Sequence, residues 1–511
     1  MKKILIITIS AIMSLTFLDS CKKDLLNVEN PNVITEDQFW KTEDDAQKGL
    51  NAAFAMFYKP GLWSRWIYFR LDLTSDEGYS ISPWVELADW TRFQYVNFDF
   101  WEGNVISFRD TYKAIFRCNQ VLAKVPEIKF GDATKQKQII AQAKFLRALN
   151  YYYAALLWEN VPLVLLPSKP DDLPAQNTLA EVWAQVEKDL TEAEADLPVS
   201  WPATSLGRPT KGSARGFLAR TYMQQRKWAE AKTALDYFFT GAGAGKYSLV
   251  ANFKDNFTAE QENNSESVFE IQFSDANKGG DGDDPNATMS TNRPQFFAPR
   301  GIGWSDGQAR FWLVNAFKEE PTTTGGIDER LRYSLFYPDL FKDFGDKTYG
   351  RNWEWNNNEC WFKKYSRDYY RTNEDYFAQT NNRMIRYADI LLMYAEVLNE
   401  LNSTATAAQY VDMVRARAKH TPLATAFPAA LLSKDAFRDR LKKERALELC
   451  GESVRWADLK RWGDLETQVK VDEVALRDPD FKNFVVGKHI RLPLPNVEIL
   501  NNTRLKQNPM Y

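Results

Sequence analysis

Histidine is scarce in this chain of 511 residues, and its scarcity excludes several kinds of site. The two histidines, His420 and His489, are too few for a zinc-binding Cys/His set, and they leave a catalytic serine or cysteine without an evident partner. The sequence also has no glycine-rich phosphate loop and no dinucleotide fingerprint. We therefore expect no catalytic residue of these classes, no bound metal and no cofactor.

The chain also has no excess of basic charge and no even set of cysteines for disulfide pairing. Lysine and arginine total 65 against 68 aspartates and glutamates, so the net charge is −3 and nothing marks a nucleic-acid-binding surface. Of the 4 cysteines, Cys21 ends the N-terminal segment, which leaves an odd set. We predict that Cys118, Cys360 and Cys450 are buried thiols and not a disulfide framework.

Residues 1–20 have the pattern of a signal peptide. Two lysines precede an apolar run over residues 4–18, which is short for a membrane span. The run ends in Leu18-Asp19-Ser20-Cys21, which resembles a lipobox, although Asp19 replaces the small neutral residue usual there. We predict cleavage before Cys21, its lipidation, and a polar tether over residues 21–35. The alternative is an ordinary secretory signal followed by a chance cysteine.

Hydrophobic periodicity predicts a mainly α-helical protein. One stripe at helical spacing consists of Tyr387, Ile390, Leu391, Tyr394 and Leu398. A second stripe follows a short polar link, at residues 407–418, so we expect two antiparallel helices with their stripes in contact. Further helices are predicted at residues 36–58, 104–125, 134–158 and 177–197, and as a pair within 207–239.

Two segments lack this periodicity and are rich in tryptophan. Residues 61–103 interrupt the helices with glycine and proline, and we interpret them as mostly loop. Residues 275–380 form a long irregular insert whose aromatic content argues against disorder, so we expect loops and short strands packed on the helices. One short strand is predicted at residues 267–274, where polar and apolar residues alternate.

Four phrases follow one another toward the C-terminus. They are RYADILLMYAEVLNE, VRARA, ERALELCGESVRWADLKRWG and RLPLPNVEILNNTRLKQNPMY. Together they resemble the C-terminal signature of the SusD/RagB family, outer-membrane lipoproteins that bind nutrients for import. The resemblance implies a scaffold of tetratricopeptide-like helix pairs with a loop-rich insert and a few short strands. It divides the chain into residues 36–260 and residues 261–511, packed as one body.

The resemblance also implies a function. It indicates a lipid-anchored protein of the cell surface that is not an enzyme, and that passes a glycan or another nutrient to a SusC-like TonB-dependent transporter. Family members bind glycans with aromatic rings on loops. We therefore predict Trp84, Trp90, Trp353 and Trp355 as ligand-binding residues, because they stand in loop segments among Asn, Asp, Gly and Arg. Trp304, in a glycine-rich phrase, is assigned to packing.

Two other functions remain open. A surface-anchored glycoside hydrolase needs only two carboxylates, and a tetratricopeptide-type adaptor would bind a protein on its concave helical face.

Two acidic segments also need an interpretation. The row Glu444, Glu448, Glu452 and Asp458 has no histidine nearby in the sequence, so we interpret it as an ion-pair network with neighbouring arginines. The acidic loop 279–288 offers carboxylates for Ca²⁺, but its spacing is not that of an EF-hand, and we expect a solvated loop.

Overall fold

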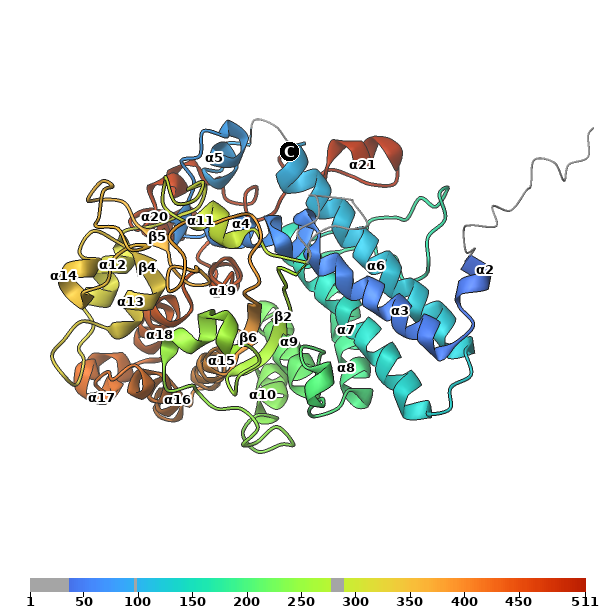
Figure 1. The fold of residues 1–511 in the computed structure, drawn as a ribbon, viewed down its shortest axis with the longest axis horizontal. Coiled ribbons are helices and arrows are strands. Elements are labelled where there is room, and N and C mark those ends of the chain that lie inside the picture. Colours follow the sequence, from blue (N-terminus) through green and yellow to red (C-terminus); the bar gives the residue numbers. More distant parts are fainter. Residues whose placement is uncertain (1–35, 96–98, 277–288) are drawn as a thin grey trace, which may run out of the picture.

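The computed structural model describes residues 36–95, 99–276 and 289–511, and α-helices dominate them (Figure 1). The predicted signal peptide, the predicted lipidation site Cys21, the predicted tether and the acidic loop 279–288 lie outside the described residues. Within the described ranges, no helix combines the length and the apolar character that crossing a membrane requires.

The N-terminal helices stack in sequence order. After the single turn α2 (Glu36–Phe39), they are α3 (Glu43–Phe54), α6 (Ile106–Lys124), α7 (Ala133–Leu157), α8 (Leu179–Asp196), α9 (Lys211–Gln224) and α10 (Trp228–Asp236). Each packs on the next, from α3 on α6 through to α9 on α10. Capping boxes at Thr42, Thr178 and Thr210 start α3, α8 and α9. The predicted scaffold of tetratricopeptide-like helix pairs is confirmed.

The stack continues through helices far along the chain. α15 (Tyr387–Glu400) packs on α10, on α16 (Thr404–Arg417) and on α18 (Lys434–Leu449). The predicted pair of helices with facing stripes is thereby confirmed. The remaining C-terminal helices are α17 (Leu423–Ala426), α19 (Arg455–Trp462), α20 (Gln468–Ala475) and α21 (Asn496–Asn501).

The insert between α10 and α15 contains short helices that the sequence did not reveal. They are α11 (Arg293–Phe297), α12 (Trp312–Lys318), α13 (Glu329–Ser334) and α14 (Leu340–Phe344). α12, α13 and α14 gather at the end of the molecule opposite α3 and α6 (Figure 1). Helices of two turns or fewer are too short to display an apolar stripe, so periodicity could not predict them.

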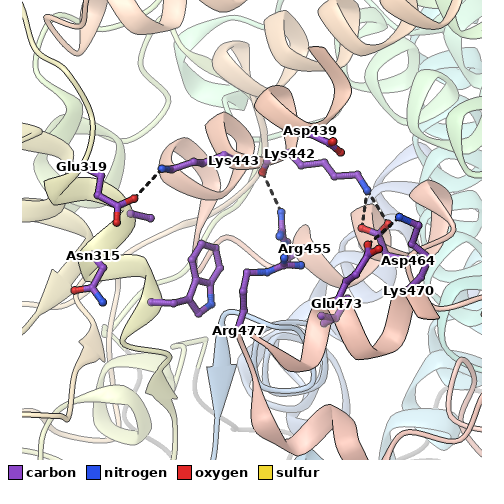
Figure 2. Close-up of a pocket in the computed structure, with 13 residues that line it drawn as sticks. Asn315, Glu319, Asp439, Lys442, Lys443, Arg455, Asp464, Lys470, Glu473 and Arg477 are labelled. Carbon is purple, nitrogen blue, oxygen red and sulfur yellow. Dashed lines mark hydrogen bonds and ion pairs between the residues drawn. The ribbon is translucent and has the colours of Figure 1, made fainter. Parts of the chain in front are cut away.

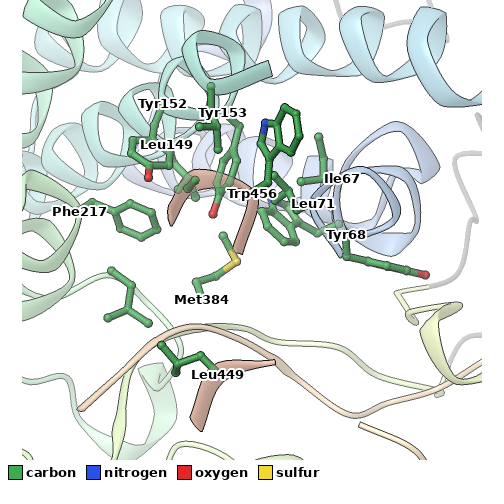
Figure 3. Packing of buried hydrophobic residues seen from close by; sticks show 14 of the residues in the cluster. Ile67, Tyr68, Leu71, Leu149, Tyr152, Tyr153, Phe217, Met384, Leu449 and Trp456 are labelled. Atoms are coloured by element: carbon green, nitrogen blue, oxygen red, sulfur yellow. The ribbon is translucent and has the colours of Figure 1, made fainter. Parts of the chain in front are cut away.

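Residues 61–103 are also more helical than predicted. They include α4 (Trp66–Leu73), α5 (Val85–Thr91) and the single π turns η3 (Pro60–Ser64) and η4 (Trp101–Val105). Every residue of α4 is buried, so the helix has no polar face and therefore no amphipathic pattern. In Figure 3, Ile67 and Leu71 of α4 lie beside Tyr153 of α7 and Trp456 of α19, in the middle of the core.

The strands form three antiparallel pairs among the described residues. β1 (Gly78–Tyr79) pairs with β3 (Gln308–Ala309), β2 (Ser267–Ile271) with β6 (Asn382–Arg386), and β4 (Leu335–Phe336) with β5 (Trp361–Phe362). The strand predicted at 267–274 is confirmed over Ser267–Ile271. In the register of β2 and β6, Ser267 lies opposite Arg386 and Ile271 opposite Asn382, so this pair joins the two ends of the insert. Single 3₁₀ turns complete the structure at η2 (Ala55–Tyr58), η5 (Val125–Glu127), η6 (Ala203–Ser205), η7 (Phe253–Phe257), η8 (Ala259–Gln261), η9 (Pro428–Leu431) and η10 (Pro479–Asn483).

One continuous hydrophobic cluster runs from Ala46 to Leu494 and takes in both parts of the chain and the insert. Cys118, Cys360 and Cys450 are buried within it as free thiols, as predicted. Burial raises the pKa of the Cys118 thiol to about 12, which leaves it protonated and unreactive at neutral pH.

The carboxylate row, which runs from α18 to Asp458 of α19, is a buried ion-pair network, as predicted. Glu448 accepts from Arg330 Nη1 at 3.0 Å and from Arg386 Nη1 at 2.6 Å, and Glu444 accepts from the same Arg330 nitrogen at 2.9 Å. Burial alone would raise the pKa of Glu448, but Arg417, Arg386 and Arg330 outweigh it and hold that pKa at about 2. A carboxylate that is permanently ionised and enclosed by arginines is unsuited to act as a general acid.

The helix pair α15–α16 gives a direct test of the fold. Tyr394 is 6% exposed, its ring stacks on Phe239 at 4.4 Å, and its hydroxyl donates to Asp236 at 2.7 Å. Tyr394→Ala should lower the free energy of unfolding by about 2–5 kcal/mol, because it leaves a cavity between the helices. Tyr394→Phe, which keeps the ring and loses only the hydrogen bond, should cost about 1 kcal/mol. Urea denaturation measures both, and equal losses would show that the ring does not pack in this interface.

Candidate functional site

The two predicted tryptophans of the α5 region differ in exposure. Trp84 directly precedes α5 and is half-buried, with its ring edge-on to Trp66 at 5.4 Å and its Nε1 donating to Glu86 at 3.2 Å. Trp90 is 5% exposed and packs between Trp66 and Phe100 in the core. The burial of Trp90 contradicts a ligand-facing ring, because α5 turns this side chain inward while Trp84 stands at the helix start.

The two predicted tryptophans of the insert form a cluster. Trp353 and Trp355 are half-buried, with ring centroids 5.1 Å apart, and both pack on the buried Trp361. The indole Nε1 of Trp355 donates to the carbonyl of Arg300 at 3.0 Å. These rings therefore support the 300–306 loop, and their contact with a ligand stays a prediction.

The structure brings Trp84 and the 300–306 loop together around an open cavity of about 660 Å³. This aromatic cavity is built from four separate segments of the chain. Its lining consists of Arg65, Ser82, Pro83, Trp84, Phe296, Arg300, Gly301, Gly303, Trp304, Asp306 and Tyr376. Its lining includes Arg65 before α4, Trp84 before α5 and Phe296 of α11, and these three helices lie near one another in Figure 1. Of the four predicted ligand-binding tryptophans, Trp84 lines it.

Trp304 is the most exposed aromatic ring of this cavity, at 52%. Its ring centroid lies 4.8 Å from that of Phe296, in a T-shaped arrangement, and 5.7 Å from that of Tyr376, while about half of the side chain stays exposed to solvent. The sequence assigned Trp304 to packing because of the neighbouring glycines. In the structure, Gly303 instead allows two backbone segments to approach each other closely. A Cβ on Gly303 would lie 2.4 Å from the carbonyl oxygen of Gln295, so only glycine permits the tight return onto α11 that presents Trp304.

The polar groups of the aromatic cavity are held in place by partners behind them. The guanidinium of Arg65 donates to Asn292 Oδ1 at 3.1 and 3.2 Å, and that of Arg300 grips Glu359 with bonds of 2.9 and 2.7 Å. Asp306 accepts from the Ser82 hydroxyl. Burial raises the pKa of the Asp306 carboxyl, and Ser82 and Arg65 partly oppose this shift. The cavity thus offers flat rings beside fixed hydrogen-bonding groups.

This arrangement favours recognition over chemistry. Aromatic rings can cover the C–H face of a sugar, while Arg65, Arg300 and Asp306 can bond its hydroxyl groups. A glycosidase needs two opposed carboxylates, whereas among the described residues the lining contributes the single carboxylate of Asp306.

The segment from Gly303 to Gly307 also fits the pattern G-x-S-x-G of serine hydrolases. Ser305 even has a positive φ of 60°, as a nucleophile would on a sharp turn. However, Ser305 is buried, and its hydroxyl accepts from Trp361 Nε1 at 2.9 Å. The turn follows α11 and does not join a strand to a helix, so the motif is a structural coincidence here.

A second cavity, of about 680 Å³, lies between α12, α18 and α20 (Figure 2). Six of its charged side chains already pair with one another, and Arg455 and Arg477 pair with Asp76 behind the lining. Lys442 bonds Asp464 at 2.6 and 2.8 Å, Lys443 reaches Glu319 at 3.2 Å, and Lys470 bonds Glu473 at 2.8 Å. A ligand would have to displace these ion pairs, so the aromatic cavity is the better candidate site.

Comparisons with known proteins agree over most of the chain. A family model described as "SusD family" matches residues 265–511, and one described as "Starch-binding associating with outer membrane" matches residues 67–223. A SusD-like protein of Formosa agariphila is 26% identical, with 96% of this chain and 95% of that protein covered.

Solved structures show the same similarity. A SusD superfamily protein from Bacteroides vulgatus superposes with a TM-score of 0.80 at 25% identity, covering 93% of this chain and 100% of the other. A structure titled "Laminarin binding SusD-like protein" gives a TM-score of 0.73 at 26% identity, covering 92% of this chain and 100% of the other.

Because Trp90 is buried and Trp304 is half-exposed, replacing each with alanine should change the stability of the protein by different amounts. Trp90→Ala should lower the free energy of unfolding by about 3–5 kcal/mol, because it empties a site in the core. Trp304→Ala should change it by about 0.5 kcal/mol, because half of that side chain already faces solvent. Chemical denaturation of the two variants decides the matter, and a large loss for Trp304→Ala would return this residue to a packing role.

Proposed function

The chain belongs to the SusD family, and from this we propose that it binds a glycan at the outer membrane and delivers it to a SusC-like TonB-dependent transporter. The observation that carries the proposal is the aromatic cavity around Trp304. Trp84, Trp304 and Tyr376 supply rings there, and Arg65, Arg300 and Asp306 supply hydrogen bonds. Rings beside anchored polar groups match the two kinds of surface that a sugar presents.

The geometry favours a glycan chain over a small isolated molecule. The cavity is open and shallow, and its rings come from different segments, so neighbouring sugar units could each contact a ring. Covering about 50 Å² of apolar surface per ring contributes roughly 1 kcal/mol. After the cost of association, two or three rings give a dissociation constant in the millimolar to micromolar range.

The class of glycan is suggested by the relatives. One structural neighbour is titled as binding laminarin, and one matching family model is described as starch-binding. Both are neutral glucans, which suits a cavity whose charged groups are engaged with Asn292, Glu359 and Ser82. We propose a neutral polysaccharide as the ligand of the aromatic cavity, bound without hydrolysis.

Membership of the family supports the proposed location and partner. A family description that names the outer membrane supports localisation there, and the apolar run before Cys21 supports a lipid anchor. A lipid-anchored protein on the outer surface would hold its ligand close to a transporter in the same membrane. The SusC-like transporter rests on the family alone.

Removal of one exposed ring tests this function. Trp304→Ala should raise the dissociation constant for laminarin or starch about five- to thirtyfold, which corresponds to the loss of roughly 1–2 kcal/mol of ring contact. Retardation in affinity gels followed by calorimetry measures the change.

The matched control is Phe341→Ala, which removes an exposed aromatic ring from α14, outside the cavity lining. It should leave affinity unchanged. If neutral glucans are not retarded, or if the two variants bind equally well, the assignment of the aromatic cavity is wrong.

A further inference from the structure

A third cavity, of about 330 Å³, lies between η7, α13 and the loop over residues 363–369. Its volume is at the lower end of the range for small-ligand sites. Tyr333 and Tyr369 line it and are half-exposed, and Thr258 and Ser366 belong to the same lining. We call this the tyrosine pocket. It shares no lining residue with the aromatic cavity.

The floor of the tyrosine pocket is a small cluster of buried aromatic side chains. Phe257 lines the pocket and belongs to a small buried cluster with Phe253 and Tyr365, against which Tyr333 packs. Lys364 and Arg386, both part of the buried ion-pair network, lie 4.9 and 5.9 Å from the centre of the Phe257 ring. The pocket is therefore built directly beside the buried ion-pair network.

The charges of the lining do not balance. Four cations, Lys254, Arg332, Lys347 and Lys363, face two carboxylates, Asp346 and Asp368, which leaves an excess of two positive charges. Both carboxylates already have cationic partners. Arg332 donates two hydrogen bonds of 2.8 Å to Asp346, and Lys363 forms an ion pair with Asp368 at 3.0 Å.

The two excess positive charges are those of Lys254 and Lys347. Among the described residues, neither Lys254 nor Lys347 forms an ion pair with a carboxylate, although the charge of Lys254 helps to lower the pKa of Asp346. The Lys254 ammonium lies 4.8 Å from the centre of the Tyr369 ring, so the aromatic face already helps to hold it. Two further carboxylates, Asp255 and Glu260, lie near Tyr333 and Tyr369 respectively, but neither lines the pocket.

One loop connects the tyrosine pocket with the aromatic cavity. Tyr369 lines the first and Tyr376 the second, and seven residues of chain span at most about 25 Å. Arg367 ties the loop together, with bonds of 2.7 Å to Glu374 and 2.8 Å to Asp375.

We propose that the tyrosine pocket is a second saccharide site, which takes a sugar ring that bears an anionic group, either a carboxylate or a sulfate ester. Lys254 and Lys347 bind the anion, and the rings of Tyr333 and Tyr369 cover the sugar. The proposal rests on the proposed function only in that the ligand is a glycan.

Matched pairs of probes separate charge from sugar. Oligogalacturonate is compared with its methyl ester, and oligosaccharides of carrageenan with the unsulfated oligosaccharides of agarose, each by calorimetry. The wild type should prefer the charged member of at least one pair, and the pair identifies carboxylate or sulfate. The double variant K254Q/K347Q should lose about tenfold in affinity for that member, and added salt should weaken the wild type more than the variant.

The control variant is K129Q/K137Q, which removes two exposed lysines that line none of the three cavities and thus changes the net charge equally. It should retain wild-type affinity. Equal binding of charged and neutral probes by the wild type, or an equal loss in both double variants, would overturn the proposal. Tighter binding of a polyglutamate peptide than of either acidic saccharide would overturn it in favour of a peptide site.

The two sites can fail independently. Trp304→Ala should weaken laminarin binding and leave the response of the tyrosine pocket to short acidic probes intact, whereas K254Q/K347Q should do the reverse. A loss of both responses in either variant would contradict separate sites. Circular dichroism confirms that each variant is folded before titration.

Discussion

The arrangement of the molecule depends on a buried network of arginines and glutamates centred on α18. Glu444 and Glu448 of α18, and Glu452 in the turn that follows it, meet arginines from three other elements. Arg330 comes from α13, Arg386 from β6, and Arg415 from α16. Because desolvating a charge is costly, each member is stable inside the protein only while its partners stay in place. The network therefore requires α13, β6 and α16 to dock on α18 in one arrangement.

This requirement extends to the loops that form the aromatic cavity. Arg330 pins the insert to the scaffold, and Arg293 of α11 forms a 2.8 Å ion pair with Asp72 of α4 and donates to the carbonyl of Gly451 at 2.7 Å. Two walls of the cavity, the start of α4 at Arg65 and α11 at Phe296, are thus fixed to the end of α18. A shallow site gains affinity when its rings are ordered before the ligand arrives. The buried charges serve binding in this indirect way.

Much of the fold could be predicted from the sequence, because long amphipathic helices such as α15 and α16 display their buried side as a stripe. The prediction weakened where burial is complete, as in α4, or where helices are very short, as in α11 to α14. The ion pairs of α18 could be inferred because a carboxylate row without histidine has few other uses. The docking of distant loops leaves no local signal, so nothing in the sequence showed that residues 82–84, 296–306 and 376 share one cavity. For the same reason Trp90 could not be distinguished from Trp84, and the role of the glycines beside Trp304 was misread.

The central claim is that the buried charges fix the insert, and with it the cavity. Hydrogen exchange of Arg330→Met, followed by mass spectrometry, tests it most directly. This change leaves Glu444 and Glu448 without one partner while keeping the bulk of the side chain, and a broken buried pair typically costs about 3–5 kcal/mol. The account predicts faster exchange across α11 to α14, unchanged exchange in α6 to α8, and weaker glycan binding. Unchanged exchange in the insert, or loosening spread evenly over all helices, would contradict it.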